Sequence, residues 1–546
     1  MRLPLLLVAA ALTSRAATYY VDSVHGRDSH PGTAPEAPWQ TLTRVNGSEF
    51  RAGDHVLFRS GSIWRGQLAP RSSGAEGAPI IIDRYGEGLK PRIDGDGSVD
   101  DAVRLYNIQF VELRNLEVTN RDLGGESVRR GVHIFLDNFG TAKHIIIAGM
   151  YIHDVNGTNT KKDNGGIIFR TSGTRTPSRF DGLTIERNVI WRVDRSAIAG
   201  ESYHWSRANW FPSLNVVIRD NLVDDIGGDG IVPWATDGVL VEHNIARNCN
   251  CRAGSYNAGI WPWSADNSLF QLNEASLTRT THDGEGFDSD FNSRNTLFQY
   301  NYSHDNEGGF MLICTPGKRN PAQNVGNIGT IVRHNISRND RARIFHLSAA
   351  EKTVVEDNAI YVGPDLDIQM LIVTNWDGWA DGALFRHNTF YVQGTVRYGH
   401  DVGHTEAGTY QIAPGWGPAR GIVFEGKPVY RTACRPAGRR RGCDRGIQRG
   451  PAVGMEWSAV RSGSAEWLRR VSETPPPVDV AAAPRTVRAS AAGALTGSCR
   501  SGGSPFESPL LGRIAFDAPT ALPFASGAIR RRTGRQGETR PDFAQG

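Results

Sequence analysis

The sequence predicts an all-β solenoid, a parallel β-helix, on three observations. A short phrase of alternating apolar residues that ends in Asn recurs along residues 108–392. Neighbouring copies mostly lie roughly 23 to 38 residues apart, a spacing typical of stacked repeats that bury their inner faces only against one another. The copies alternate with a period of two and lack the helical period of 3.6, so each is expected to be a strand.

Each repeat is expected to place its Asn at the bend between two strands. An asparagine at the same bend of every coil can hydrogen-bond to its own turn and to the Asn of the next coil, which satisfies polar groups buried by the stacking. The sequence therefore predicts an asparagine ladder. Its expected members are Asn115, Asn188, Asn221, Asn244, Asn273, Asn301, Asn335, Asn358 and Asn388.

The chain divides into four segments. Residues 1–16 have a basic start, an apolar stretch and small residues before a cleavage position, as in a secretory signal peptide, so we expect a secreted or periplasmic protein. Residues 17–107 are expected to hold an N-terminal cap and the first coils, with a short helix around Trp39 to Val45 covering the open end of the stack. Residues 108–404 are the expected β-helix.

The last segment, residues 405–546, has a different composition. From Arg431 to Gly546 it holds 19 Arg, no Lys and 9 acidic residues, and the repeat disappears. A biased, aperiodic sequence of this kind does not build a core. It indicates either a disordered basic tail or the product of a shifted reading frame, and its scattered charge matches no nucleic-acid-binding motif.

The first residues after the expected signal peptide carry a resemblance to a known superfamily. Tyr-Tyr-Val-Asp at 19–22 is followed by Gly26, Asp28, Gly32-Thr33 and Pro-Trp-Gln-Thr-Leu at 38–42, and then by the Asn-bearing repeats. Together they resemble bacterial exported right-handed parallel β-helix proteins of the pectate-lyase and polygalacturonase superfamily. The resemblance implies a right-handed helix that acts on polysaccharide, but that superfamily contains lyases, hydrolases, epimerases and adhesins, so the reaction stays open.

One strand of each coil follows a Gly and should alternate inward and outward side chains. Alignment of these strands by their first large apolar residue predicts an inward column of Ile167, Ile198, Ile231, Ile260, Phe287 and Phe310. The residues one and three positions later should face outward. They are Ile168 and Arg170, Ala199 and Glu201, Val232 and Trp234, Trp261 and Trp263, Asp288 and Asp290, and Met311 and Ile313.

The outward positions suggest a carbohydrate-binding groove. Trp234 and Trp263 should lie on neighbouring coils, with Asp290 one coil further. Aromatic rings stack on the CH faces of sugars while carboxylates bind the hydroxyl groups, although packing beneath a long loop would also explain the tryptophans. Further candidates for substrate binding are Trp261, Arg170, Glu201, His282 and His304.

Asp288 and Asp290 are the expected catalytic pair, with Glu285 as a substitute for either. Two positions apart on a strand, their Cα atoms should lie about 6.6 Å apart on one side, which suits either a retaining or an inverting glycosidase. A carboxyl whose pKa is raised by burial and by its neighbour's charge could protonate the leaving oxygen while the other activates water. The expected function is a glycoside hydrolase that requires no cofactor.

Several alternatives stay open from the residues alone. An Asp-x-Asp on an outward strand can be a simple solvated pair, or Asp283, Glu285 and Asp288 could bind Ca²⁺, which prefers carboxylate oxygens. A calcium-dependent polysaccharide lyase would need a base to take a proton from a uronate, and Lys162 could reach the face from its loop. A non-catalytic glycan-binding or adhesive protein would use the same groove without cleavage.

The remaining features of the sequence concern disulfides, membrane insertion and binding partners. Six cysteines are too few for a disulfide scaffold, and Cys249, Cys251 and Cys314 should lie on neighbouring coils, where they pair or simply pack. Beyond the expected signal peptide no apolar run approaches the roughly 18 residues of a membrane helix. We expect a monomer that binds polysaccharide and neither nucleic acid nor membrane.

Overall fold

The computed structural model describes residues 16–122, 127–253, 256–280, 282–315, 322–374, 382–400, 403–404, 410–411, 422–426 and 429–431. Most of the expected signal peptide and nearly all of the expected tail lie outside these residues. The described residues form stacked coils of parallel strands, which confirms the predicted right-handed parallel β-helix. No helix within the described ranges is long and apolar enough to cross a membrane.

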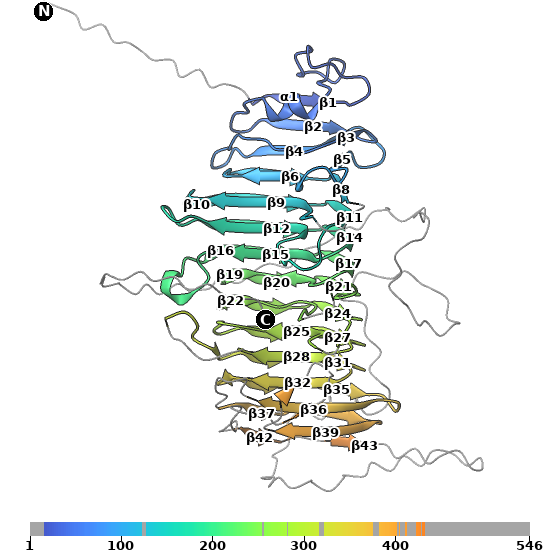
Figure 1. The fold of residues 1–546 in the computed structure, drawn as a ribbon, viewed down its shortest axis with the longest axis vertical. Coiled ribbons are helices and arrows are strands. Elements are labelled where there is room, and N and C mark those ends of the chain that lie inside the picture. Colours follow the sequence, from blue (N-terminus) through green and yellow to red (C-terminus); the bar gives the residue numbers. More distant parts are fainter. Residues whose placement is uncertain are drawn as a thin grey trace, which may run out of the picture. The chain divides into compact units, whose positions relative to one another are not determined.

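Three sheets run along the stack (Figure 1). Sheet A has 16 strands and sheet B has 13, and each strand pairs in parallel with the strand of the next coil. The strands of sheet A are β1 (Thr18–Val21), β2 (His55–Arg59), β4 (Ile80–Tyr85), β7 (Val111–Arg114), β10 (Thr141–Ala148), β13 (Arg179–Glu186), β16 (Ser213–Arg219), β19 (Trp234–Asp237), β20 (Leu240–Glu242), β22 (Trp263–Asp266), β23 (Leu269–Gln271), β26 (Leu297–Gln299), β30 (Ile331–Arg333), β34 (Val354–Glu356), β37 (Leu384–Arg386) and β42 (Val423–Glu425).

Sheet B follows sheet A in each coil. Its strands are β3 (Ile63–Arg65), β5 (Arg92–Asp94), β8 (Glu117–Arg121), β11 (Tyr151–Asn156), β14 (Val189–Val193), β17 (Leu222–Ile226), β21 (Ile245–Arg247), β24 (Glu274–Ser276), β27 (Tyr302–His304), β31 (Ile336–Arg338), β35 (Ala359–Val362), β38 (Thr389–Val392) and β43 (Val429–Arg431).

The third face, sheet C, consists of two blocks of five strands. The first holds β6 (Asp101–Tyr106), β9 (Arg130–Asp137), β12 (Gly165–Ser172), β15 (Ser196–Ser202) and β18 (Ile231–Val232). The second holds β25 (Glu285–Ser289), β28 (Gly309–Cys314), β32 (Arg343–Ser348), β36 (Asp367–Thr374) and β39 (Thr395–His400). Two small pairs, β29 (Asn327–Ile328) with β33 (Ala350–Glu351) and β40 (Gly403–His404) with β41 (Tyr410–Gln411), stand apart from these sheets.

The core is a set of columns in which one side chain per coil stacks on its equivalent in the next. Alternation along each strand sends every second residue inward, where it can be covered only by the neighbouring coils. On sheet A the column is fully buried from start to end. It runs through Ile82, Leu113, Ile147, Ile185, Ile218, Val241, Phe270, Phe298, Val332, Val355 and Phe385.

The asparagine ladder is present between sheets A and B. The side-chain amide of Asn244 donates to Oδ1 of Asn273 at 3.0 Å and to the Ile218 carbonyl at 2.9 Å, and the Asn244 backbone N–H donates to the same Oδ1. The same bonds link each ladder member to the next from Asn188 to Asn388, all by buried side chains. The ladder members are Asn188, Asn221, Asn244, Asn273, Asn301, Asn335, Asn358 and Asn388.

Asn115 was wrongly predicted as a member. Leu113 aligns with Ile147 and Ile185, so Asn115 is equivalent to Arg187 and the ladder position of its coil holds Leu116. Asn115 lies instead in the left-handed region at φ 55°, where it donates to Asp83. The phrase at Asn115 is one residue shorter than the later copies, and this shift moves its Asn out of register.

The N-terminal cap begins later than predicted. Helix α1 (Leu42–Asn46) starts after Thr41, whose side chain accepts from the Arg44 N–H as an N-cap. Trp39 is still extended because it bridges to Val21 of β1, and its ring stacks on Tyr19 at 4.7 Å. The helix then buries Leu42 and Val45 in the same core as the first coils.

The cysteines do not pair with one another as one expectation allowed. Cys249 and Cys314 are buried free thiols, and Cys251 is disulfide-bonded. Cys249 packs in the core, and Cys314 faces outward from sheet C.

Replacement of a ladder asparagine should destabilise the fold. Asn273→Ala would leave the buried Asn244 amide and the Val241 carbonyl without their partners, so we expect the free energy of unfolding to fall by roughly 2–4 kcal/mol. Chemical denaturation measures this loss. The control is Asn209→Ala, which removes an exposed asparagine and should change stability by less than about 0.5 kcal/mol. Equal losses in the two variants would contradict a stabilising ladder.

A second buried polar column should make stability depend on pH. Asp340 accepts from the Asn306 backbone and side chain and from Ser337, and burial raises its pKa to about 6. A raised folded-state pKa means that the folded protein holds its proton longer, so unfolding free energy falls by about 3 kcal/mol in total as pH rises from below about 4 to above about 6. Asp340→Asn should remove this decrease in denaturation series across pH, and an unchanged slope would refute the assignment.

Candidate active site

Sheet C is interrupted at one coil, and the acidic residues lie beside this interruption. Between β18 and β25 the chain makes only single bridges, from Ile231 to Ile260 and from Ile260 to Phe287. The coil of Ile260 contributes its next strand, β22, to sheet A rather than to sheet C. The side chains here are therefore held between two regular blocks of strands (Figure 1).

The predicted register holds up to Phe287 and then shifts by one residue. Ile167, Ile198, Ile231, Ile260 and Phe287 align as expected. Phe287, however, pairs with Met311 rather than with Phe310, because β28 aligns Gly309 with Glu285. The close approach of Gly309 to the Arg343 carbonyl, at φ 142°, leaves no room for a side chain at this bend.

This shift changes which side chains of β28 face outward. Met311 and Ile313, predicted outward, point into the main core, whereas Leu312 and Cys314 stack on the outward residues of the preceding coil. Two outward columns result. One is Ile168, Ala199, Val232, Trp261, Asp288 and Leu312, and the other is Arg170, Glu201, Trp234, Trp263, Asp290 and Cys314.

The first outward column is covered rather than exposed. Ile168, Ala199, Val232 and Trp261 form a second apolar cluster outside the main core, together with Ala258. Trp261 is only 4% exposed, so the expectation that it binds substrate is wrong for this arrangement. Its indole N–H donates to Asp229 at 3.0 Å and its ring lies beneath the Lys162 ammonium at 4.6 Å.

The second outward column carries a half-buried aromatic group beside Asp290. The ring centroids of Trp234 and Trp263 are 4.0 Å apart, and Trp263 stacks on Phe291 at 4.9 Å. Trp205, from the segment between β15 and β16, adds a fourth ring 5.1 Å from Trp263. Sequence reasoning missed Trp205 because it comes from an insertion two coils earlier. Nearby, Arg207 fixes that insertion by a two-pronged ion pair with buried Asp266.

Five carboxylates define what we call the acidic cluster: Asp229, Asp283, Glu285, Asp288 and Asp290. Asp229 and Glu285 are completely buried and Asp288 is 3% exposed, whereas Asp283 and Asp290 are only part-buried. This difference matters because a group that acts on a substrate must be reachable from outside. It separates Asp283 and Asp290 from the other three.

Glu285 is held by an internal ion pair. Its Oε1 lies 2.8 Å from Nη2 of Arg343, and both side chains are buried. Arg343 also donates to the Asp283 carbonyl at 2.9 Å. Glu285 therefore neutralises a buried arginine, and both its predicted roles, catalyst and Ca²⁺ ligand, conflict with this contact.

Asp288 lies between the accessible carboxylates and lacks a partner on one oxygen. Its Oδ1 is buried and forms no hydrogen bond to the described residues. Burial raises the pKa of Asp288 well above its usual value, and the charges of Asp290, Asp283 and Glu285 raise it further. An unpartnered buried carboxylate is costly when ionised, so Asp288 favours its protonated form.

Asp290 and Asp283 differ in how their charges are supported. Oδ1 of Asp290 accepts from the Phe291 N–H at 2.5 Å and from the Cys314 thiol at 3.1 Å. Burial raises the pKa of Asp290, but these two hydrogen bonds oppose that effect. Burial and the charge of Glu285 raise the pKa of Asp283 well above its usual value, with Arg343 in opposition. Asp283 is thus the better proton donor and Asp290 the better carboxylate.

Two cations hold Asp229 at the edge of the acidic cluster. Lys162 donates to its Oδ2 at 3.0 Å and Arg195 to the same oxygen at 3.2 Å. Lys162 also donates to the Tyr256 carbonyl at 3.0 Å, which ties its loop to the loop three coils later. The ammonium group is thereby fixed among acceptors.

The other predicted residues are partly assembled around this cluster. Arg170 and Glu201 form an ion pair of 3.2 Å in the second outward column, and burial raises the pKa of Glu201. His282 precedes Asp283 and stacks on Tyr256 at 5.9 Å. His282 adjoins the acidic cluster through Asp283, whereas Arg170 and Glu201 lie on coils before the interruption of sheet C.

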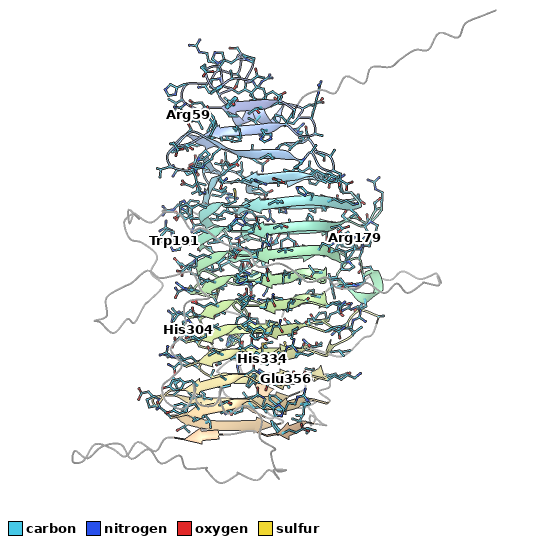
Figure 2. All side chains as sticks on the ribbon, turned by 180° about the vertical axis from the view of Figure 1, so that it is seen from behind. Arg59, Arg179, Trp191, His304, His334 and Glu356 are labelled. Carbon is cyan, nitrogen blue, oxygen red and sulfur yellow. The ribbon has the colours of Figure 1, made fainter. Side chains whose placement is uncertain are left out.

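His304 is not brought to the acidic cluster. It lies on β27 of sheet B, the sheet that also carries Trp191 on β14 (Figure 2). Burial lowers the pKa of His304, but hydrogen bonds to Asp305 and Glu274 outweigh that effect and raise it to about 9. The sequence predicted His304 in a loop, but His304 is the last residue of the three-residue strand β27, and the loop begins after it. The predicted face for His304 was therefore wrong.

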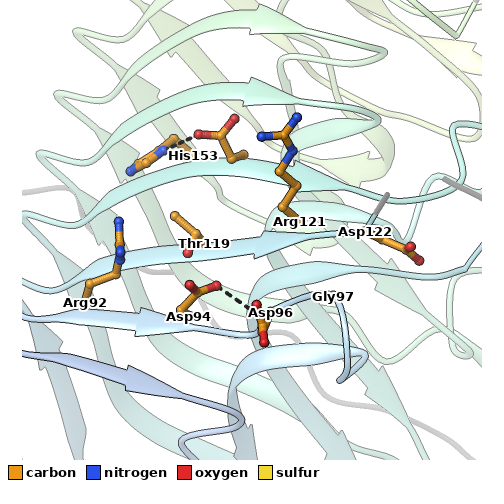
Figure 3. A pocket seen from close by; sticks show the side chains of 9 residues that line it. Arg92, Asp94, Asp96, Gly97, Thr119, Arg121, Asp122 and His153 are labelled. Carbon is orange, nitrogen blue, oxygen red and sulfur yellow. Dashed lines mark hydrogen bonds and ion pairs between the residues drawn. The ribbon is translucent and has the colours of Figure 1, made fainter. Parts of the chain in front are cut away.

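A separate hollow of about 520 Å³ lies on sheet B (Figure 3). It forms where β11 gains a residue relative to β8, a β-bulge that turns His153 and Asp154 toward it. These two side chains form an ion pair of 2.7 Å, and Asp94 accepts from the Asp96 N–H across the hollow. The hollow is polar and comes from other coils than the acidic cluster.

Comparison with known proteins relates the chain to glycosidases. No protein-family model matches. A lacto-N-biosidase from Bifidobacterium longum subsp. longum is 30% identical over 480 residues, which cover 70% of this chain and 29% of that protein. An alpha-1,3-galactosidase A from Akkermansia muciniphila is 23% identical over 129 residues, covering 22% of this chain and 21% of that protein.

The crystal structure of a GH136 lacto-N-biosidase from Eubacterium ramulus superposes with a TM-score of 0.60 at 26% identity, over 76% of this chain and 68% of that chain. The chain shares the fold of this glycosidase. It spans less than a third of the length of the Bifidobacterium relative, so similarity extends to the β-helix and not to that protein as a whole.

Proposed function

We propose that the protein is a glycoside hydrolase and that Asp283 and Asp290 are its reacting carboxylates. One observation carries this proposal: only these two members of the acidic cluster are part-exposed, and Asp290 lies in the same outward column as the paired rings of Trp234 and Trp263. Two carboxylates that flank a glycosidic bond are the common requirement of most glycosidases. The similarity to lacto-N-biosidases supports the same reaction class.

The environments of the two carboxylates assign their roles. Asp283, whose pKa is raised well above its usual value by burial and by Glu285, keeps a proton for the leaving oxygen. Asp290 accepts two hydrogen bonds that favour its ionised form, and it attacks the sugar or activates water. Asp288, which burial favours in its protonated form, adds no negative charge beside Asp290.

The aromatic surface supports binding of sugar rings. Trp263 and Trp234 lie in the same outward column as Asp290, so a ring stacked on them would place the next linkage near the carboxylates. The substrates to try first are a chromogenic lacto-N-bioside, after the name of the relatives, and neutral polysaccharides. We place the enzyme outside the cytoplasm, since residues 1–16 have the pattern of a signal peptide.

The contacts oppose the alternative of a uronate lyase. Lys162 is bound to buried Asp229 and so is not available as a base. Among the described residues, the five carboxylates of the acidic cluster also outnumber the three cations that contact them, Lys162, Arg195 and Arg343, and so repel an anionic uronate. Ca²⁺ would have to displace Arg343 from Glu285, so the predicted Ca²⁺ set of Asp283, Glu285 and Asp288 does not fit this arrangement.

Two isosteric variants test the proposal directly. Asp283→Asn and Asp290→Asn should each lower kcat by about 10²–10⁴-fold, since each removes a group that transfers a proton or forms a bond. The wild-type rate should fall as pH rises through the raised pKa of Asp283, because the acid must be protonated to act. Release of reducing sugar or chromophore measures both effects.

Asp94→Asn is the matched control, because it makes the same chemical change in the hollow on sheet B. It should leave kcat within about twofold of wild type, while thermal unfolding confirms that all variants fold. Loss of activity in Asp288→Asn with activity retained in Asp283→Asn would instead make Asp288 and Asp290 the pair. Cleavage of no glycan by the wild type, with glycan binding intact, would establish an adhesive protein.

A further inference from the structure

The acidic cluster contains a group of three donors that suits a metal ion. One oxygen of Asp288, one oxygen of Asp290 and the sulfur of Cys314 all lie within 4.8 Å of one another. They come from two adjacent strands of sheet C, β25 with the residue that follows it and β28, so the backbone pairing fixes their spacing. Ligands of a tetrahedral Zn²⁺ stand about 3.3–3.8 Å apart, a distance that small side-chain rotations would reach.

A second observation also favours a cation at this position. Asp288 is 3% exposed and its Oδ1 has no hydrogen-bond partner among the described residues. A buried carboxylate oxygen without a donor is satisfied either by a proton or by a positive ion. Within the part of the chain that the structure describes, two nearby cations already have other partners, because Arg343 is paired with Glu285 and Lys162 with Asp229.

The donor set selects the kind of metal. A thiolate is a soft ligand that binds Zn²⁺ or Cd²⁺, whereas Ca²⁺ and Mg²⁺ prefer oxygen atoms alone. We propose that Asp288, Asp290 and Cys314 form a binding site for a thiophilic divalent cation such as Zn²⁺, and that its occupation blocks hydrolysis. The second part rests on the proposed function, because it requires Asp290 to be a reacting carboxylate.

Binding of the metal ion would replace one hydrogen bond and leave one coordination position open. The thiol of Cys314 now donates to Oδ1 of Asp290 at 3.1 Å. On binding, the Cys314 thiol and the protonated Asp288 carboxyl each release a proton to solvent, and the thiolate and the two carboxylates ligate the cation. Three protein ligands leave a fourth position for water on the part-exposed side of Asp290. Asp290 can then no longer attack the sugar or activate water.

Cysteine variants provide a direct test of binding. Cd²⁺ added to the metal-free protein should give the ultraviolet charge-transfer band of a cadmium–thiolate bond at one equivalent, and calorimetry should show one Zn²⁺ per chain. Cys314→Ser should remove the band and weaken Zn²⁺ binding by at least about tenfold. Cys249→Ser is the matched control, because it alters a buried free thiol of the core and should leave band and affinity unchanged.

Absence of the band in wild type, or an equal band in Cys314→Ser, would overturn the site. Anomalous diffraction from Zn²⁺-soaked wild-type crystals gives an independent result: a peak between Asp288, Asp290 and Cys314 supports the site, and a peak only elsewhere refutes it. These readouts need no turnover, so they separate failure of the site from failure of the proposed function. If the protein hydrolyses glycan, Zn²⁺ should inhibit wild type and Cys249→Ser reversibly, with much less effect on Cys314→Ser.

Discussion

In-register stacking of the coils is the constraint on which the rest of the structure depends. Each strand pairs in parallel with its equivalent in the next coil, and the asparagine ladder fixes the bend between sheets A and B at the same position in eight coils. The coil in which a side chain lies therefore sets its height along the stack, and the strand register sets whether it points inward or outward. A one-residue shift would send an outward carboxylate into the core.

The stacked strands allow the protein to hold several carboxylates close together, although their burial and mutual repulsion cost stability. Burial and mutual repulsion raise the pKa values of Asp283, Asp288 and Asp290, and flexible residues would relieve that repulsion by moving apart. Here the strands of sheet C prevent such movement. The ion pair of Glu285 with Arg343 and the binding of Asp229 by two cations limit the excess negative charge. The same burial and repulsion that cost stability favour a protonated carboxyl that can serve as a proton donor.

The sequence predicted the features that repeat and missed those that occur once. Period-two alternation and recurrent Asn residues were sufficient for the fold, for eight ladder positions and for the column of Trp234, Trp263 and Asp290. Asn115, Met311 and Ile313 were misplaced because each depends on a one-residue change in coil length, which a repeated pattern does not reveal.

The sequence also did not reveal which outward side chains are covered by loops or which charged residues form ion pairs. Trp261 faces outward as expected, but loops from other coils cover it, and the ion pair of Glu285 joins residues 58 positions apart in sequence. Neither could be inferred from a local pattern. Asp283 was assigned only to a possible metal site because it precedes the strand, whereas its accessibility makes it a candidate for catalysis.

The central claim is that the part-exposed carboxylates on sheet C act on a glycan bound over the neighbouring tryptophans. A crystal structure of the Asp290→Asn variant with an uncleaved oligosaccharide tests it most directly. We expect a sugar ring on Trp263 or Trp234, with the oxygen of the scissile bond within hydrogen-bond distance of Asp283. A glycan bound only in the hollow on sheet B, or with its linkage remote from Asp283, would contradict the account.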